Sequence, residues 1–332
     1  MDATTSISML NRVQELSETG RNAAVVAELG AMPVKELEQS PTLSLLFGVA
    51  QGRLGRHSSG KQWVATALET ARARGDAAIE ARALNVSGAI AFDEGRVDDA
   101  AGHFANGLAE AQRQGDRETV GKCSNNLGII AHLRGEYGRA IGSYTMAMAA
   151  YQQVGRRKGV AITLHNMSIT YRDERNLAKA LETEERAGEE AMSSGDLSLQ
   201  GLICCGRGEI RLKAGDAEVA RLEIQRALAF HREVGDVVRE AEDLRALAEA
   251  LDLMQQPVQA EAMLRDVIAR ARKLDQSLLT AQAERDLARV LHRQERDAEA
   301  GEVARRARDR FESLGAASEV RRLDGFLREL VT

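Results

Sequence analysis

Residues 115–155 read GDRETVGKCSNNLGIIAHLRGEYGRAIGSYTMAMAAYQQVG, and this stretch decides the fold. Its first half carries apolar residues at helical spacing over 120–131, and its second half does so again over 140–151. Each half ends near a glycine, Gly135 or Gly155, the residue that most readily takes the left-handed conformation at the end of a helix. The stretch therefore predicts two antiparallel helices that are joined by a tight turn.

The same pattern recurs every forty residues along most of the chain. Four units begin with a Gly-Asp pair, in which glycine ends one helix and aspartate caps the next. A small residue occupies one register of each first helix, which lets two helices approach closely. This small column consists of Gly48, Gly88, Gly128, Ser168, Gly208, Ala248 and Ala288. Seven units in one register predict an array of stacked helix pairs.

These units resemble the tetratricopeptide repeat in its forty-residue form. One unit carries the resemblance in Leu127 and Gly128, followed by Ala140 and Tyr144, and its neighbours have related residues at the same places. Kinesin light chains, Leu-Gly-Asn-repeat adaptors and Rap-type bacterial regulators contain similar arrays. The resemblance implies an all-α fold, an α-solenoid wound as a right-handed superhelix of about eight antiparallel helix pairs.

Three regions are expected along the chain. Residues 41–316 are expected to form seven forty-residue tetratricopeptide units. Residues 1–40 are expected to form a degenerate helix pair that caps the N-terminal end. Residues 317–332 read as a single amphipathic helix that caps the last exposed apolar face.

Composition excludes several classes of protein. With 44% hydrophobic residues, 29% charged residues and a net charge of -5, the chain gives no reason to expect a nucleic-acid partner. No run of about 18 apolar residues occurs, so no membrane span is expected. Its N-terminus lacks the features of a signal peptide, and its three cysteines suit a reducing compartment. Arginine greatly outnumbers lysine, which is typical of GC-rich bacterial genomes. We therefore expect a cytoplasmic, bacterial protein.

The sequence shows no convincing catalytic or metal site. Residues 55–62 nearly match a phosphate-binding loop, but Gln62 replaces the hydroxyl residue that would bind magnesium, and no strand precedes it. The six histidines have no metal-ligand spacing. Adjacent carboxylates such as Glu184 and Glu185 are expected on a solvated helix face. We therefore expect no catalytic residues, no metal, no cofactor and no enzymatic activity.

The resemblance implies that the first helix of each pair lines a concave groove, where a partner would bind. Asparagine side chains there could bond the backbone of an extended peptide, and basic side chains could hold acidic groups. In the alternative interpretation, Asn85, Asn125 and Asn126 bond neighbouring helix backbones within the array. The predicted partner-binding residues are Arg82, Asn85, Phe92, Lys122, Asn125, Ile129, His132, His165, Ile169 and Arg172.

Two functions fit these features. The first is a scaffold or adaptor that binds a protein segment or peptide in the concave groove. The alternative is a ligand- or peptide-sensing regulatory domain of a bacterial signalling protein, although residues 1–40 are too short for the N-terminal effector bundle of Rap-type regulators. The sequence identifies neither the partner nor the oligomeric state.

Overall fold

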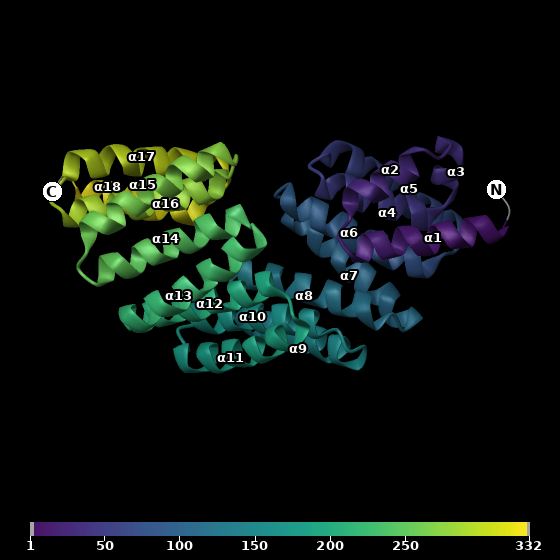
Figure 1. Cartoon of the computed structure of the whole chain (residues 1–332), viewed down its shortest axis with the longest axis horizontal. Coiled ribbons are helices and arrows are strands. Elements are labelled where there is room, and N and C mark those ends of the chain that lie inside the picture. Colours follow the sequence, from purple (N-terminus) through teal and green to yellow (C-terminus); the bar gives the residue numbers. More distant parts are fainter. Residues whose placement is uncertain (1–2, 331–332) are drawn as a thin grey trace. The chain divides into compact units, whose positions relative to one another are not determined.

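The computed structural model describes the backbone of residues 3–330 and the side chains of residues 8–330. Within this range the chain consists of helices joined by short turns, and it contains no strand (Figure 1). Two compact units, residues 1–159 and 160–332, are described separately. The prediction of an all-α array of helix pairs is confirmed. None of the helices in the described range combines the length and apolar character that a membrane span requires.

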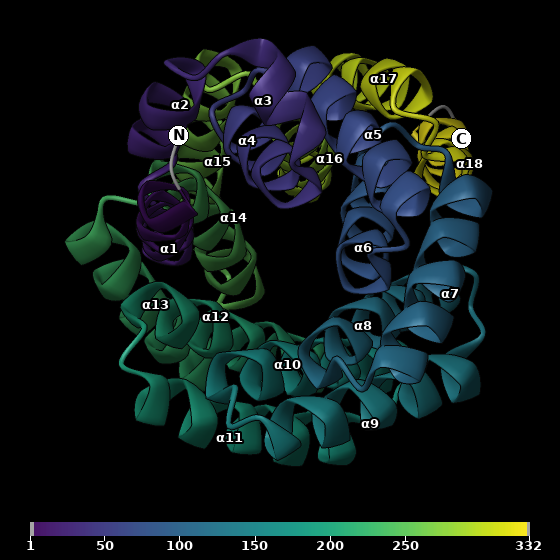
Figure 2. The same ribbon diagram turned by 90° about the vertical axis from the view of Figure 1, so that its right-hand side faces the viewer.

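Unit 1 contains three N-terminal helices followed by three helix pairs. Figure 2 shows α6 and α8 on one side of this array and α7 and α9 on the other. The bounds are α1 Ala3–Glu18, α2 Asn22–Gly30, α3 Val34–Gln39, α4 Pro41–Arg53, α5 His57–Arg74, α6 Ala77–Asp93, α7 Val97–Gln114, α8 Arg117–Leu133 and α9 Tyr137–Gln153.

The short helix α3 is absent from the sequence-based expectation of a single helix pair over residues 1–40. Pro33 precedes α3, and Pro41 begins α4, so the two prolines confine α3 to six residues. The Ser40 hydroxyl accepts a hydrogen bond from the backbone N–H of Leu43 at 3.4 Å, which caps α4. The N-terminal segment therefore has three helices.

Unit 2 continues the same alternation and ends in a single helix. Its bounds are α10 Arg157–Asp173, whose first turn still belongs to unit 1, α11 Leu177–Ser194, α12 Leu197–Ala214, α13 Ala217–Val234, α14 Val237–Leu253, α15 Pro257–Lys273, α16 Ser277–Arg293, α17 Asp297–Ser313 and α18 Ala317–Glu329.

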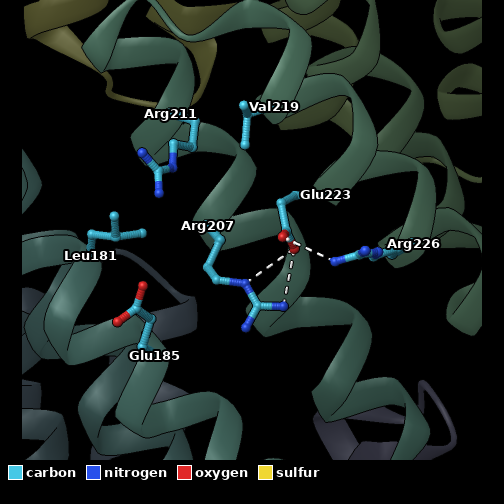
Figure 3. Close-up of a pocket in the computed structure, with 7 residues that line it drawn as sticks. All are labelled: Leu181, Glu185, Arg207, Arg211, Val219, Glu223 and Arg226. Carbon is cyan, nitrogen blue, oxygen red and sulfur yellow. Dashed lines mark hydrogen bonds and ion pairs between the residues drawn. The ribbon is translucent and has the colours of Figure 1, made fainter.

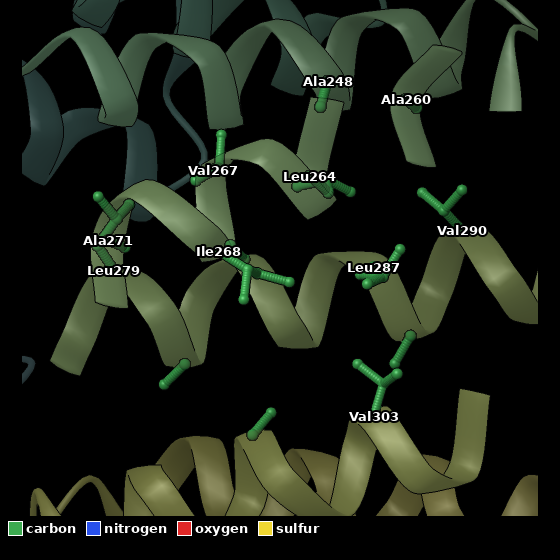
Figure 4. Close-up of a cluster of buried hydrophobic side chains, with 14 of the residues drawn as sticks. Ala248, Ala260, Leu264, Val267, Ile268, Ala271, Leu279, Leu287, Val290 and Val303 are labelled. Carbon is green, nitrogen blue, oxygen red and sulfur yellow. The ribbon is translucent and has the colours of Figure 1, made fainter. Parts of the chain in front are cut away.

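A continuous apolar core joins the last helices of unit 2. Leu264 on α15, Leu287 on α16 and Val303 on α17 are almost fully buried in this cluster (Figure 4). Leu323 extends the cluster onto α18 and is only 3% exposed. Because α18 buries this side chain against the preceding pair, it covers the end of the core.

The glycines of the small column lie against one side chain of the second helix of their pair. A Cβ atom on Gly88 would lie 2.6 Å from the Phe104 ring, and one on Gly128 would lie 2.5 Å from the Tyr144 ring. The facing position recurs every forty residues, as the small column does. This facing column consists of Val64, Phe104, Tyr144, Glu184, Ile224, Leu264 and Ala304. The small column therefore creates the space into which the second helices pack.

Alanine at Gly88 is expected to destabilise unit 1, because its Cβ would overlap the Phe104 ring. Overpacking of this kind costs about 1–3 kcal/mol. Gly102 in α7 offers a matched control, because a Cβ there meets nothing within 4 Å. Gly102→Ala should stabilise the helix by about 0.5–1 kcal/mol. Urea denaturation followed by circular dichroism measures both changes, and equal shifts for the two variants would contradict this packing.

Candidate functional site

A hollow of about 900 Å³ lies between α4 and α6, beside the start of α5. Its middle is lined by apolar residues, namely Val49, Val86, Ala89 and Ile90. Three glycines without side chains, Gly48, Gly52 and Gly60, also line the hollow. Gly48 and Gly60 bring two helix backbones together, since a Cβ on Gly48 would lie 2.9 Å from the Gly60 carbonyl oxygen. Gly52 faces open space, with nothing within 4 Å of a Cβ built on it.

A second, smaller hollow of about 190 Å³ lies on the other side of α6, against α7 and α8. Phe92, Phe104 and Ile129 give it an apolar lining. Ala89 and Asp93 line both hollows, so the two meet along α6. We call the two together the paired hollows.

Asn85 lines the larger hollow. Its Oδ1 accepts hydrogen bonds from Asn126 Nδ2 at 3.1 Å and from Cys123 Sγ at 3.6 Å. The amide oxygen of Asn85 therefore links α6 to α8 through side chains, whereas the alternative interpretation expected bonds to helix backbones. Among the predicted residues, Asn85, Phe92 and Ile129 line the paired hollows.

The charged groups of the larger hollow differ in how they are paired. Lys61 Nζ lies 2.7 and 3.0 Å from the two carboxylate oxygens of Glu94, and the hydrogen bonds of Lys61 and Arg96 lower the pKa of Glu94. Asp93 makes no ion pair with any residue of the described range. Burial raises the pKa of Asp93, and the charge of His57 opposes this only in part. Asp93 is therefore a carboxylate outside the ion pairs of the described range, with His57 as a nearby basic group, and it lines both hollows.

The other predicted residues of unit 1 have partners inside the array. Arg82 Nε lies 3.1 Å from an Asp116 oxygen, and Lys122 pairs with Glu118 at 2.9 Å. The His132 ring lies against Tyr137, with 5.6 Å between ring centroids. Asn125 is only 8% exposed. The role of these residues in partner binding stays a prediction.

His165 occupies an internal position in unit 2. It is 8% exposed, and its Nδ1 lies 2.7 Å from Glu184 Oε1. Ser168 also donates a hydrogen bond to Glu184, which is fully buried. The expectation that Glu184 lies on a solvated face is therefore wrong, because this carboxylate occupies the facing column of its helix pair. Gly206 on α12 makes room for it, since a Cβ there would overlap the carboxylate.

Arg172 and Ile169 also belong to unit 2. Ile169 is half-buried on α10. Arg172 Nη1 lies 2.6 Å from a Glu209 oxygen of α12, and Arg245 of α14 lies 3.6 Å from the other Glu209 oxygen. Burial raises the pKa of Glu209, but Arg172 and Arg245 outweigh it and hold that pKa below its usual value.

The same chain of ion pairs continues to the last helix. Arg245 Nη1 pairs with Asp286 of α16 at 2.9 Å, and Asp286 also pairs with Arg285 at 2.8 Å. Arg285 reaches Glu319 of α18 at 3.1 Å. We call this chain, from Arg172 to Glu319, the ion ladder. It links α10, α12, α14, α16 and α18, so these basic residues are used within unit 2.

A separate groove of unit 2 lies between α11 and α13, above α12 (Figure 3). Its volume is about 240 Å³, and it holds three arginines. Arg207 and Arg226 both pair with Glu223, at 3.0 and 3.2 Å. Figure 3 shows Glu185 across the groove from them, without an ion pair. Its charges largely neutralise one another, which makes it a weaker candidate than the paired hollows.

The near-match to a phosphate-binding loop is part of a helix turn. Gly55 has φ of +78°, the left-handed conformation of the turn between α4 and α5, and Gly60 packs against Gly48. Across the described side chains, no group of three or more histidine, cysteine, aspartate or glutamate residues is placed to hold a metal ion.

Sequence analysis missed several residues of the paired hollows. Val49 stands in the same repeat column as Ala89 and Ile129, so the register would have indicated it. Gly52 stands in the same column as the predicted residues Phe92 and His132, so the register would have indicated it too. The column of Asp93 contains Arg53 and Leu133 and gave no such signal.

A family model for the tetratricopeptide repeat matches residues 79–153 and, overlapping them, 123–187. The first match takes in α6 to α9, of which α6, α7 and α8 line the paired hollows, and the second reaches into α11. Together with the helix pairs described above, these matches show that residues 79–187 contain tetratricopeptide repeats.

Several solved structures have a fold similar to that of this chain. A Rap protein complexed with competence and sporulation factor superposes with a TM-score of 0.68 and 13% identity, over 99% of this chain and 98% of that chain. The apo quorum sensor NprR from B. thuringiensis gives 0.66 and 14% identity, with complete coverage of both chains. A tetratricopeptide-repeat sensor protein, PH0952 from Pyrococcus horikoshii, gives 0.66 and 11% identity, over 96% of this chain and 48% of that chain. No curated protein matches the sequence.

Proposed function

We propose that unit 1 binds an extended segment of another protein, or a free peptide, in the paired hollows, and that the protein acts as an interaction scaffold or adaptor. The observation that carries this proposal is the pair of apolar hollows that meet along α6, with Asn85 and Asp93 as polar groups beside them. Concave apolar sites with a few placed polar groups are the usual form of a ligand site.

The likeness to Rap and NprR supports a second form of the same proposal. One of these structures holds a competence and sporulation factor, and the other is named a quorum sensor. This chain spans nearly the whole of both. In this form the bound peptide changes the conformation of the array, and the protein is a regulator rather than a tether.

We propose binding rather than catalysis for the paired hollows, although a protein of the same fold is named aspartyl phosphate phosphatase F, from Bacillus subtilis. The apolar lining supplies contact area for a ligand. All three cysteines are free thiols, which supports a reducing cytoplasmic location. Neither nucleic acid nor membrane is part of the proposed interaction.

Leucine at Gly52 is expected to abolish this binding. Gly52 lines the larger hollow, and a Cβ built on it meets no atom within 4 Å, so we expect a leucine there to occupy the hollow without a clash at its Cβ. Peptides selected from a phage-displayed random library on the full chain, then measured by fluorescence anisotropy, should bind Gly52→Leu at least about tenfold more weakly.

Gly102→Leu is the matched control, because Gly102 lies in the helix α7, is exposed, and is absent from both hollows. It should bind the selected peptides as the wild type does. Selection of no peptide by the wild type, or equal binding by Gly52→Leu, would count against the proposal. A change in the radius of gyration on peptide addition, measured by small-angle X-ray scattering, would favour the regulator over the tether.

A further inference from the structure

We propose that the bound segment carries two apolar side chains three residues apart, with a basic residue between them that pairs with Asp93. This inference rests on the proposed function of the paired hollows and specifies the partner that they accept. The larger hollow takes the bulkier apolar side chain, and the smaller one takes the other.

The spacing follows from the position of the hollows on either side of α6. Packed helices lie about 8–10 Å apart, so the two hollows are separated by about that distance. A polyproline-type segment rises about 3.1 Å per residue and returns to the same face every three residues, which gives about 9 Å. A β-strand presents the same face at about 6.6 or 13 Å, which is too short or too long. Apolar residues at positions i and i+3 of such a segment therefore reach both hollows.

The volumes of the two hollows determine which apolar side chain of the bound segment each hollow accepts. The larger has a volume of about 900 Å³, and its glycines leave room for an aromatic side chain. The smaller has about 190 Å³ and is closed by Phe92, Ile129 and the buried Phe104, which is 2% exposed. A single aliphatic side chain fits there.

The charge between the two anchors follows from Asp93, which lines both hollows. Glu94 is already paired with Lys61 and Arg96. Arg53, His57 and Lys61 line only the larger hollow, and no residue of the described range forms an ion pair with Asp93. A lysine or arginine held between the two anchors would supply the missing cation.

The test uses a fluorescein-labelled peptide of sequence GPWRPLPG, in which Trp and Leu are three residues apart and Arg lies between them. Anisotropy titration against the full chain compares it with GPWRLPPG, which shortens the spacing, and with GPWEPLPG, which reverses the charge. The first peptide should bind about tenfold more tightly than either of the others. Equal binding of all three would overturn the inference.

Asp93 is tested separately by charge reversal. Asp93→Lys should invert the preference, so that GPWEPLPG binds more tightly than GPWRPLPG. Glu69→Lys is the control, because Glu69 is exposed on α5, lines neither hollow and changes the net charge equally. It should keep the wild-type preference. An unchanged preference in Asp93→Lys would overturn the role of Asp93.

The failure of this inference and the failure of the proposed function have different signatures. If Gly52→Leu abolishes binding of library-selected peptides that lack the apolar spacing and the basic residue, the function stands and the inference is wrong. If neither the library nor GPWRPLPG yields any binding to the wild type, both are wrong.

Discussion

Replacing His165 by alanine is expected to lower the free energy of unfolding by about 3–5 kcal/mol, because it removes a partner from a fully buried carboxylate. Glu184 has no exposed surface, and His165 and Ser168 are its hydrogen-bond partners. The other pairs place apolar residues such as Phe104 and Ile224 in the same column. Urea denaturation followed by circular dichroism measures the change.

A combined variant separates this structural role from partner binding. His165→Asn, Ser168→Gly and Glu184→Ile together recreate the pattern of neighbouring pairs, with Asn85, Gly208 and Ile224 at the corresponding places. Replacing a buried polar cluster by well-packed apolar groups is often neutral or stabilising, so this variant should regain most of the stability. If His165→Ala instead keeps wild-type stability and loses peptide binding, His165 belongs to the binding surface as the sequence predicted.

Removal of the Asp243 carboxylate should be about equally costly, at about 3–5 kcal/mol, because it leaves a buried histidine without its counter-ion. His231 Nδ1 lies 2.6 Å from Asp243 Oδ2, and its Nε2 lies 3.1 Å from the Ser198 carbonyl oxygen. Both side chains of the pair are only 1% exposed. Two acceptors facing two ring nitrogens are the arrangement of a protonated imidazole, which donates from both. Asp243→Ala measured by the same denaturation tests this.

The pair also makes stability depend on pH. Burial alone would lower the pKa of His231, but the hydrogen bond and charge of Asp243, with the Ser198 carbonyl, outweigh it and raise that pKa. The folded state thus holds the proton more tightly than the unfolded chain. The contribution of His231 is complete below pH about 6.5 and is lost as the pH rises through the folded pKa.

Stability should therefore fall as the pH rises above about 6.5 in the wild type, and His231→Gln should remove this part of the slope. Burial also raises the pKa of Asp243, so its contribution to stability likewise falls as the pH rises, but at lower pH. The half-exposed His103 provides a control, and His103→Gln should retain the wild-type slope. A slope that His231→Gln leaves unchanged would contradict this assignment.

Much of the fold could be predicted because each helix pair repeats one packing contact. The small column and the helix-ending glycines fix the register, and Gly115 and Gly155 take φ of +71° and +66° as a helix end requires. The helix α3 was missed because its six residues show no clear period and lie outside the repeat. The local sequence signals were therefore sufficient to predict the helix pairs, and the structure differs from the prediction in the irregular N-terminal segment.

The candidate site was predictable only in part. The repeat columns identify which residues share a helix face, but they do not show which of these residues are already bonded within the array. Asn85, Phe92 and Ile129 line the hollows, and their role in partner binding stays a prediction. His165 stands in the same column as Asn85, yet Glu184, nineteen residues further on, binds it internally. Apart from the adjacent Arg285 and Asp286, the ion ladder joins residues 34 to 41 positions apart in sequence, and no single column contains both partners of a pair.

Neighbouring helix pairs contact each other through specific residues that are not repeated along the chain. These contacts limit which whole repeats could be duplicated or deleted without a clash. Tyr151 lies against Gly121 and Gly159, where a Cβ would lie 2.7 Å from its ring in each case. Forty residues after Gly159 the chain has Leu199. Excising residues 157–196 would preserve the helical period but bring a leucine to the place where Tyr151 requires glycine. Each helix pair therefore has residues that fit only its own neighbour. A deletion or duplication that leaves the protein folded must keep both residues of each such contact.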